Sequence, residues 1–236
     1  MTIRATWFVN RASRPPGAGI RCLARSRRLS DWAGCLVFSV WACITLSKAP
    51  GVGILLAPGL LFELFVALSF LAREQPKAVR ATMRARFSAY GGSFLVLVFL
   101  QGAQLYQPEW FAPAANTSML VGITLWIAGS IWTTYSVWHL RHAFSIEPQA
   151  RRLVTGGPYG FARHPVYAGY FVQYAGMWLV FPTLPFALVL FAWALLMADR
   201  MQLEEGILAE AFPEYSDYRR RVGALLTVRR HRTARV

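Results

Sequence analysis

Long apolar runs separated by short arginine-rich segments decide what this sequence can fold into. The runs cover residues 32–49, 54–71, 91–106, 118–138, 166–181 and 186–199. A helix that crosses a bilayer needs about 20 apolar residues, so each run is long enough, or nearly so, to form one. Only 15% of the residues are charged, where a soluble domain carries about 25%. The pattern predicts an all-α integral membrane protein with about six transmembrane helices and a C-terminal cytoplasmic helical segment.

The distribution of basic residues predicts the orientation in the membrane. When the loops are assigned to alternating sides, all 25 basic residues except Lys48 fall on one side. Lysine and arginine accumulate on the cytoplasmic side of membrane proteins, so both termini are expected there, in a prokaryotic inner membrane. The formal net charge of +14 does not predict nucleic-acid binding, because no folded basic domain remains outside the spans.

Four parts of the chain are expected. Residues 1–30 carry seven arginines and form a basic arm that lies on anionic lipid. Residues 31–117 form three N-terminal spans, residues 118–225 the functional core, and residues 226–236 a basic tail. The three cysteines, Cys22, Cys35 and Cys43, form no CxxC pattern and are interpreted as structural, and no metal site is expected.

Glu63 lies in the middle of the second apolar run. A carboxylate at membrane depth is costly and by default indicates function. Nothing nearby in the sequence completes a site, so the favoured interpretation is a glutamate that holds two helices together.

The stretch 153–170, LVTGGPYGFARHPVYAGY, differs from everything around it. Pro165 suits the first turn of a helix, and His164 before it is pushed out of the helical region. Arg163 and His164 are therefore expected at the start of a helix that runs from about Val166. A helix start favours anions and tyrosine rings hold cations, which together favour a zwitterionic or sulfonium ligand.

A second polar cluster follows the last apolar hairpin and returns to the same face of the membrane. Arg200 and Glu204 are one helical turn apart and share a face. Glu204 and Glu205 point about 100° apart, so only one of them can face a given ligand. From spacing alone, an ordinary ion pair on a solvated amphipathic helix is the favoured interpretation.

Together the two pieces resemble the isoprenylcysteine carboxyl methyltransferase family and the related phospholipid methyltransferases. The resemblance covers roughly residues 120–225 and rests on Arg-His-Pro-x-Tyr-x-Gly, the paired glutamates and a Phe-x-x-Tyr-x-x-Tyr tail. The chain departs from the family pattern after Val222, where Gly223 follows in place of proline. The resemblance implies S-adenosylmethionine as cofactor, with Arg200 facing the methyl acceptor and Arg163 as a second catalytic candidate. The implied cofactor-binding residues are Leu153, Val154, Tyr159, His164, Pro165, Tyr167, Gly169, Glu204 and Glu205.

The acceptor is left open by the sequence. A lipophilic carboxylate, amine or thiol entering from the bilayer is expected, with membrane lipid as the surrounding partner. A carboxylate needs no general base and could be oriented by Arg200. Another acceptor would need a base, for which His139, His142 and Glu204 are candidates.

Two other functions compete with methyl transfer. A nicotinamide-dependent membrane reductase of the sterol-reductase type carries a similar Arg-His-Pro motif but resembles this chain less after the hairpin. A non-enzymatic membrane protein is the third interpretation. Adjacent Glu204 and Glu205 favour the methyltransferase.

Overall fold

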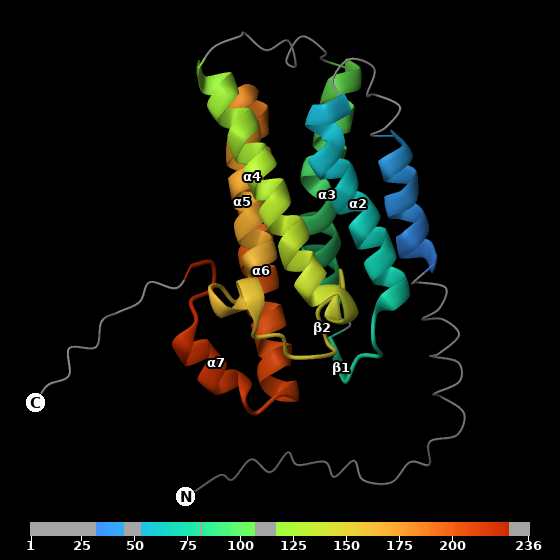
Figure 1. The fold of residues 1–236 in the computed structure, drawn as a ribbon, viewed down its shortest axis with the longest axis vertical. Helices are drawn as coiled ribbons and strands as arrows, with labels where there is room; N and C mark the ends of the chain where they lie inside the picture. The colour runs from blue at the N-terminus through green and yellow to red at the C-terminus, as the bar shows by residue number, and fades with distance from the viewer. Residues whose placement is uncertain (1–31, 45–52, 81, 107–116, 227–236) are drawn as a thin grey trace, which may run out of the picture.

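The computed structural model describes residues 32–44, 53–80, 82–106 and 117–226 as a bundle of long helices with a small polar subdomain at one end (Figure 1). The predicted basic arm and most of the basic tail lie outside these ranges. The long helices are Trp32–Ile44, α2 (Gly53–Ala72), α3 (Met83–Tyr106), α4 (Thr117–Leu140), α5 (Pro165–Val180) and α6 (Leu184–Ala211). The small subdomain contains β1 (Ala78–Val79), η2 (Arg141–Ala143), β2 (Gln149–Ala150), η3 (Gly157–Gly160) and α7 (Tyr215–Arg221).

Two of the described helices are long and apolar enough to cross a membrane, α4 with η2 (Thr117–Ala143) and α6 (Leu184–Ala211). The outer face of α6 carries Leu184, Leu188, Phe191 and Leu195, each more than half exposed. Contiguous apolar surfaces of this kind mark contact with another apolar phase. The helical class and the association with a membrane are therefore supported, whereas six spans and cytoplasmic termini stay predictions.

Two helices extend further than the apolar runs. α3 begins at Met83 rather than near residue 91, because Thr82 Oγ1 accepts a hydrogen bond from the backbone N–H of Ala85 and opens the helix early. α6 does not end near residue 199 but continues to Ala211. Its polar residues from Arg200 onward bind partners on other segments. The change from apolar to polar residues therefore marks where the functional part of α6 begins, and the helix itself continues.

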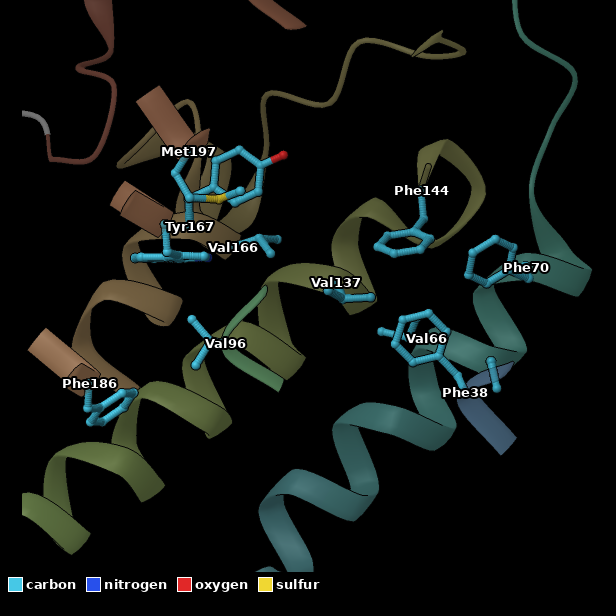
Figure 2. Packing of buried hydrophobic residues seen from close by; sticks show 12 residues of the cluster. Phe38, Val66, Phe70, Val96, Val137, Phe144, Val166, Tyr167, Phe186 and Met197 are labelled. Atoms are coloured by element: carbon cyan, nitrogen blue, oxygen red, sulfur yellow. The ribbon is translucent and has the colours of Figure 1, made fainter. Parts of the chain in front are cut away.

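The bundle interior is packed with aromatic and aliphatic side chains (Figure 2). Phe70 of α2 stacks on Phe38 at 6.0 Å between ring centroids and meets Phe144 edge-on at 5.6 Å. A second, smaller cluster joins α7 to the polar end of α6 through Tyr215, Tyr218 and Ile207. Both clusters include residues of the segment between η2 and η3: Ile146 belongs to the first, and Ala150 and Leu153 belong to the second.

α4 and α5 touch backbone to backbone along a ladder of glycines. A Cβ atom at Gly122 would lie 2.6 Å from the carbonyl oxygen of Gly176, and one at Gly129 would lie 2.8 Å from that of Gly169. Small residues allow this approach between membrane helices. Trp132 Nε1 also donates to the carbonyl oxygen of Pro165 at 2.9 Å, so α4 fixes the start of α5.

Substitution of Gly169 by valine is expected to destabilise the protein. Its Cβ would lie 2.1 Å from Thr133 Oγ1, and overpacking of this kind costs about 1–3 kcal/mol. The measurement is the thermal midpoint in detergent, with Gly102→Val as the control, because no heavy atom lies within 4 Å of a Cβ at Gly102. Equal midpoints for the two variants would contradict the close packing.

Candidate active site

The predicted helix start at the Arg-His-Pro motif is confirmed. Pro165 opens α5, and His164 caps it with φ −123° and ψ 61°, outside the helical region. Gly157, upstream in η3, has a positive φ of 59°, and its missing side chain leaves room for the ring of His139. Glycine adopts a positive φ without steric cost. Gly157 and the His164-Pro165 pair therefore each set the local backbone that leads into α5.

The chain beyond α7 folds back over the motif. The backbone N–H groups of Arg163 and His164 donate to the carbonyl oxygens of Gly223 and Ala224 at 2.8 and 2.9 Å. Arg163 Nη1 donates to the carbonyl oxygens of Val222 at 2.7 Å and Arg219 at 3.0 Å. Glycine at 223 therefore does not prevent the last segment from docking.

Tyr218 adds a further hydrogen bond between α7 and the motif. Its hydroxyl donates to the carbonyl oxygen of Tyr159 at 2.6 Å. Burial raises the pKa of Tyr218 to about 12, against the opposing charge of Arg163, so its phenol stays protonated as a donor at neutral pH. Burial also raises the pKa of Tyr159 well above its usual value.

The adjacent glutamates serve two different clusters, as their angular separation on a helix requires. Glu205 accepts from Arg163 Nε at 2.9 Å and lies 3.1 Å from His164 Nε2. Glu204 accepts from the hydroxyl of Tyr167 at 2.5 Å and from Arg200 Nε at 3.0 Å. His164 Nδ1 lies 3.7 Å from Glu204 Oε2, so the imidazole connects the two clusters.

Arg200 is 5% exposed and ties three segments together. Besides Glu204, its guanidinium donates to Ser93 Oγ at 2.9 Å and to the carbonyl oxygen of Ile146 at 2.7 Å. Two longer bonds reach the carbonyl oxygens of Ala89 at 3.3 Å and Ser145 at 3.4 Å. The predicted pair with Glu204 therefore exists, but it is buried rather than solvated.

Four rings form a stacked ladder along α5. His164 and Tyr167 are parallel within 7° at 5.5 Å, and Tyr167, Tyr170 and Tyr174 follow at 6.3 and 6.2 Å. The Arg200 guanidinium lies 5.4 Å from the Tyr167 ring centre. The ladder presents the polarisable faces that favour a cation.

These groups surround a cavity of ≈ 500 Å³, within the usual size of a small-molecule site. Of the predicted site residues, eight line it: Leu153, Val154, Tyr159, Arg163, His164, Tyr167, Arg200 and Glu204. The other three do not. Pro165 begins α5, and Gly169 packs against α4. Glu205 binds Arg163 and His164 but does not line the cavity itself.

Tyr215 also lines the cavity, although the sequence pattern alone gave it no role. The residue is 1% exposed, yet its hydroxyl has no hydrogen-bond partner among the described residues. Burial raises the pKa of Tyr215, so the phenol keeps its proton. A buried donor without an acceptor is costly. The sequence signal for Tyr215 is its spacing of three residues from Tyr218 in the Phe-x-x-Tyr-x-x-Tyr tail.

The two candidate histidine bases lie elsewhere. His139 and His142 border a separate hollow with Arg141 and Arg152. His142 Nδ1 lies 2.8 Å from the carbonyl oxygen of Ala72, and His139 Nδ1 lies 3.0 Å from that of Tyr135. Of the three candidate bases, only Glu204 borders the cavity.

Comparison with known proteins supports the resemblance inferred from the motifs. A model of the phospholipid methyltransferase family matches residues 117–215. Over 121 residues, the chain is 31% identical to the protein-S-isoprenylcysteine O-methyltransferase of Saccharomyces cerevisiae, which covers 48% of this chain and 50% of the yeast protein.

Two bacterial proteins are also similar. The nickel-cobalt-cadmium resistance protein NccN of Alcaligenes xylosoxydans xylosoxydans is 28% identical over 133 residues, covering 56% of this chain and 59% of that protein. The cobalt-zinc-cadmium resistance protein CzcN of Cupriavidus metallidurans is 29% identical over 133 residues, covering 56% and 58%. The chain thus matches between half and three fifths of the length of these relatives.

Proposed function

We propose that this protein, whose residues 117–215 match the phospholipid methyltransferase family, transfers a methyl group from S-adenosylmethionine to a lipophilic acceptor at the cytoplasmic face of a membrane. The observation that carries the proposal is the cavity, which joins the polar group of Glu204, Arg200 and His164 to the apolar interior of the helix bundle. A methyltransferase for lipids needs both a polar donor site and an apolar acceptor site in one space. The described basic segments gather at the same end of the bundle as the polar group (Figure 1), which supports the cytoplasmic side.

The residues around the cavity fit S-adenosylmethionine. Its ammonium group and ribose hydroxyls would be held by the carboxylate of Glu204, and its carboxylate by Arg163 and the hydroxyl of Tyr215. Its sulfonium would lie against the rings of Tyr167 and Tyr170. The buried hydroxyl of Tyr215 is consistent with this fit, because it lacks an acceptor among the described residues.

S-adenosylmethionine supplies an electrophilic methyl group when it is bound. The protein's part is to bind the acceptor close to that methyl group, to orient the acceptor and to exclude water. Alignment alone can lower a reaction barrier by several kcal/mol. Glu205 and Arg163 fix His164 at the start of α5, and the segment 222–224 covers them. Glu205 therefore acts as a positioning residue behind the cavity.

A carboxylate acceptor is the version of the reaction that these side chains favour. Glu204 Oε1 already accepts hydrogen bonds from Tyr167 and Arg200, so this oxygen is not open to take a proton from an acceptor. A carboxylate needs no base, and Arg200 could exchange its long bonds to Ala89 and Ser145 for the acceptor oxygens.

The test is calorimetry with S-adenosylmethionine on the detergent-purified chain, followed by transfer of labelled methyl to lipid carboxylates. Micromolar binding and incorporation of label into the lipid fraction are expected. Absence of binding in both detergent and lipid nanodiscs would overturn the proposal, and retention of a nicotinamide cofactor instead would identify a reductase.

The Tyr215→Phe variant is expected to bind S-adenosylmethionine about tenfold more weakly, since a hydrogen bond to a charged group contributes about 1.5–3 kcal/mol. Its thermal midpoint in the absence of cofactor should not fall, because the hydroxyl has no partner among the described residues. Tyr218→Phe is the matched control. It loses the bond to the carbonyl oxygen of Tyr159 and should lower the midpoint instead. Equal affinity of wild type and Tyr215→Phe would remove Tyr215 from the cofactor site.

A further inference from the structure

The proposed reaction assigns no role to the hollow beside the end of α4. Its volume is ≈ 480 Å³. Its walls come from residues 138–143, at the end of α4 and in η2, and from residues 152–157, which lead from β2 into η3. Because Gly157 has no side chain, this second segment packs directly against the ring of His139. The hollow is thus formed by two packed segments, and it is large enough for a small polar group.

The charged and titratable side chains around the hollow are all basic. None of the described residues that line it carries a carboxylate, and the basic ones are His139, Arg141, His142 and Arg152. Arg141 and Arg152 are exposed, and the ion pairs among the described residues use other arginines. A phosphate or another anion would therefore meet a positive charge that no carboxylate in the wall neutralises.

Arg141 is placed to donate hydrogen bonds to such an anion. Its guanidinium lies 5.3 Å from the centre of the Trp138 ring, and a guanidinium over the face of a ring keeps its in-plane N–H groups for other partners. Arg152 lines the hollow from the other segment. Two guanidinium groups that border one space from two segments can bind the oxygens of one phosphate.

The outer face of α4 indicates where the rest of the ligand would lie. Ile131, Tyr135 and Trp138 follow one another at intervals of four and three residues, so they share one face of the helix. Their exposed fractions are 59%, 48% and 50%. α4 with η2 is long and apolar enough to cross a membrane, and tryptophan favours the boundary between membrane and water. The exposed apolar face thus ends at the hollow, at the level where lipid head groups lie.

We propose that the hollow binds the phosphate of an anionic membrane lipid. Arg141 and Arg152 are its ligands, and the acyl chains lie along Ile131, Tyr135 and Trp138. Basic pockets beside membrane helices bind lipid head groups. A free phosphate has the same charge chemistry but would leave the apolar face of α4 uncovered. A zwitterionic head group would bring its ammonium group to the arginines, with no carboxylate among the described wall residues to hold it.

The test measures by calorimetry how three probes bind to the full chain in an uncharged detergent: dihexanoylphosphatidylglycerol, dihexanoylphosphatidylcholine and inorganic phosphate. The two lipids have the same acyl chains and differ in the net charge of the head group. We expect phosphatidylglycerol to bind at least about tenfold more tightly than either other probe, since it alone combines an unneutralised phosphate with acyl chains. S-adenosylmethionine is left out of the titration, so the result does not depend on the proposed function.

The Arg141→Gln variant should bind phosphatidylglycerol about tenfold more weakly, since it loses charge-assisted hydrogen bonds to the phosphate. Arg141 lines the hollow but not the main cavity, whereas Arg152 lines both. Arg152→Gln is therefore the second variant, used should the first fail to fold.

Arg221→Gln is the matched control. It removes one exposed positive charge from α7, at the same end of the bundle but outside the hollow (Figure 1), and should leave lipid binding unchanged. Equal binding of the two lipids, or equal binding of phosphatidylglycerol and inorganic phosphate, would overturn the inference. Equal losses in Arg141→Gln and Arg221→Gln would also overturn it, because they would show attraction to the overall positive charge rather than to this site.

Discussion

The Glu204→Gln variant is expected to bind S-adenosylmethionine about ten- to a hundredfold more weakly than the wild type, because one hydrogen bond to a charged group contributes about 1.5–3 kcal/mol. Glu204 borders the cavity and accepts from Tyr167 and Arg200. Glutamine keeps the shape and one acceptor oxygen, so those contacts persist while the charge that attracts the ammonium is lost. Calorimetric titration with the cofactor measures the change.

Stability has to be separated from binding in this variant. Arg200 is buried and loses its anionic partner, so the thermal midpoint should fall, and the titration is made well below it. Asp199→Asn is the matched control. It removes a carboxylate from the same helix, where Asp199 pairs with Arg84 at the exposed surface. Unchanged affinity in Glu204→Gln, or an equal loss in Asp199→Asn, would contradict the assigned role of Glu204.

The parts of the site that depend on neighbouring residues could be predicted from the sequence. Pro165 sets the start of α5 and pushes His164 out of the helical region, because both effects act within a residue or two. The division of labour between Glu204 and Glu205 follows from the rotation per residue of any α-helix. The family match over residues 117–215 supports the resemblance drawn from these local patterns.

Contacts between distant segments could not be predicted. Arg200 meets Ser93 and Ile146, and no spacing in a single sequence reports which loop covers a helix end. The same limit hid the cavity shared by Glu63 and Gln101. The interpretation of Glu63 as a residue that holds two helices together stays a prediction, although Glu63 also borders the cavity.

α6 extends beyond its apolar run for a physical reason. The apolar run ends near residue 199, but helix formation does not require apolar residues, and no proline interrupts the chain before Pro213. The helix therefore carries Arg200, Glu204 and Glu205 beyond the apolar part of the bundle as a rigid extension. Rigid placement of charged groups is what a transfer site needs.

The Arg200→Lys variant is expected to lower turnover at least about a hundredfold while cofactor affinity changes by less than about threefold. Lysine keeps a positive charge beside Glu204 but replaces a planar fork of five donors with a flexible point charge. Ser93, Ile146 and the acceptor can then no longer be held together, and misalignment of the reacting groups by about 1 Å costs about a hundredfold in rate. Labelled-methyl transfer at saturating cofactor, normalised to folded protein, measures the loss.

A purely structural Arg200 would give a different result. The same variant would then lower the thermal midpoint, yet each folded molecule would turn over at the wild-type rate below that midpoint. Arg84→Lys serves as the comparison, since Arg84 bonds Asp199 at the exposed surface of α3 and its change should affect neither quantity strongly. A fall in turnover per folded molecule, with cofactor affinity retained, would separate acceptor orientation by Arg200 from cofactor binding by Glu204, although the two side chains lie 3.0 Å apart.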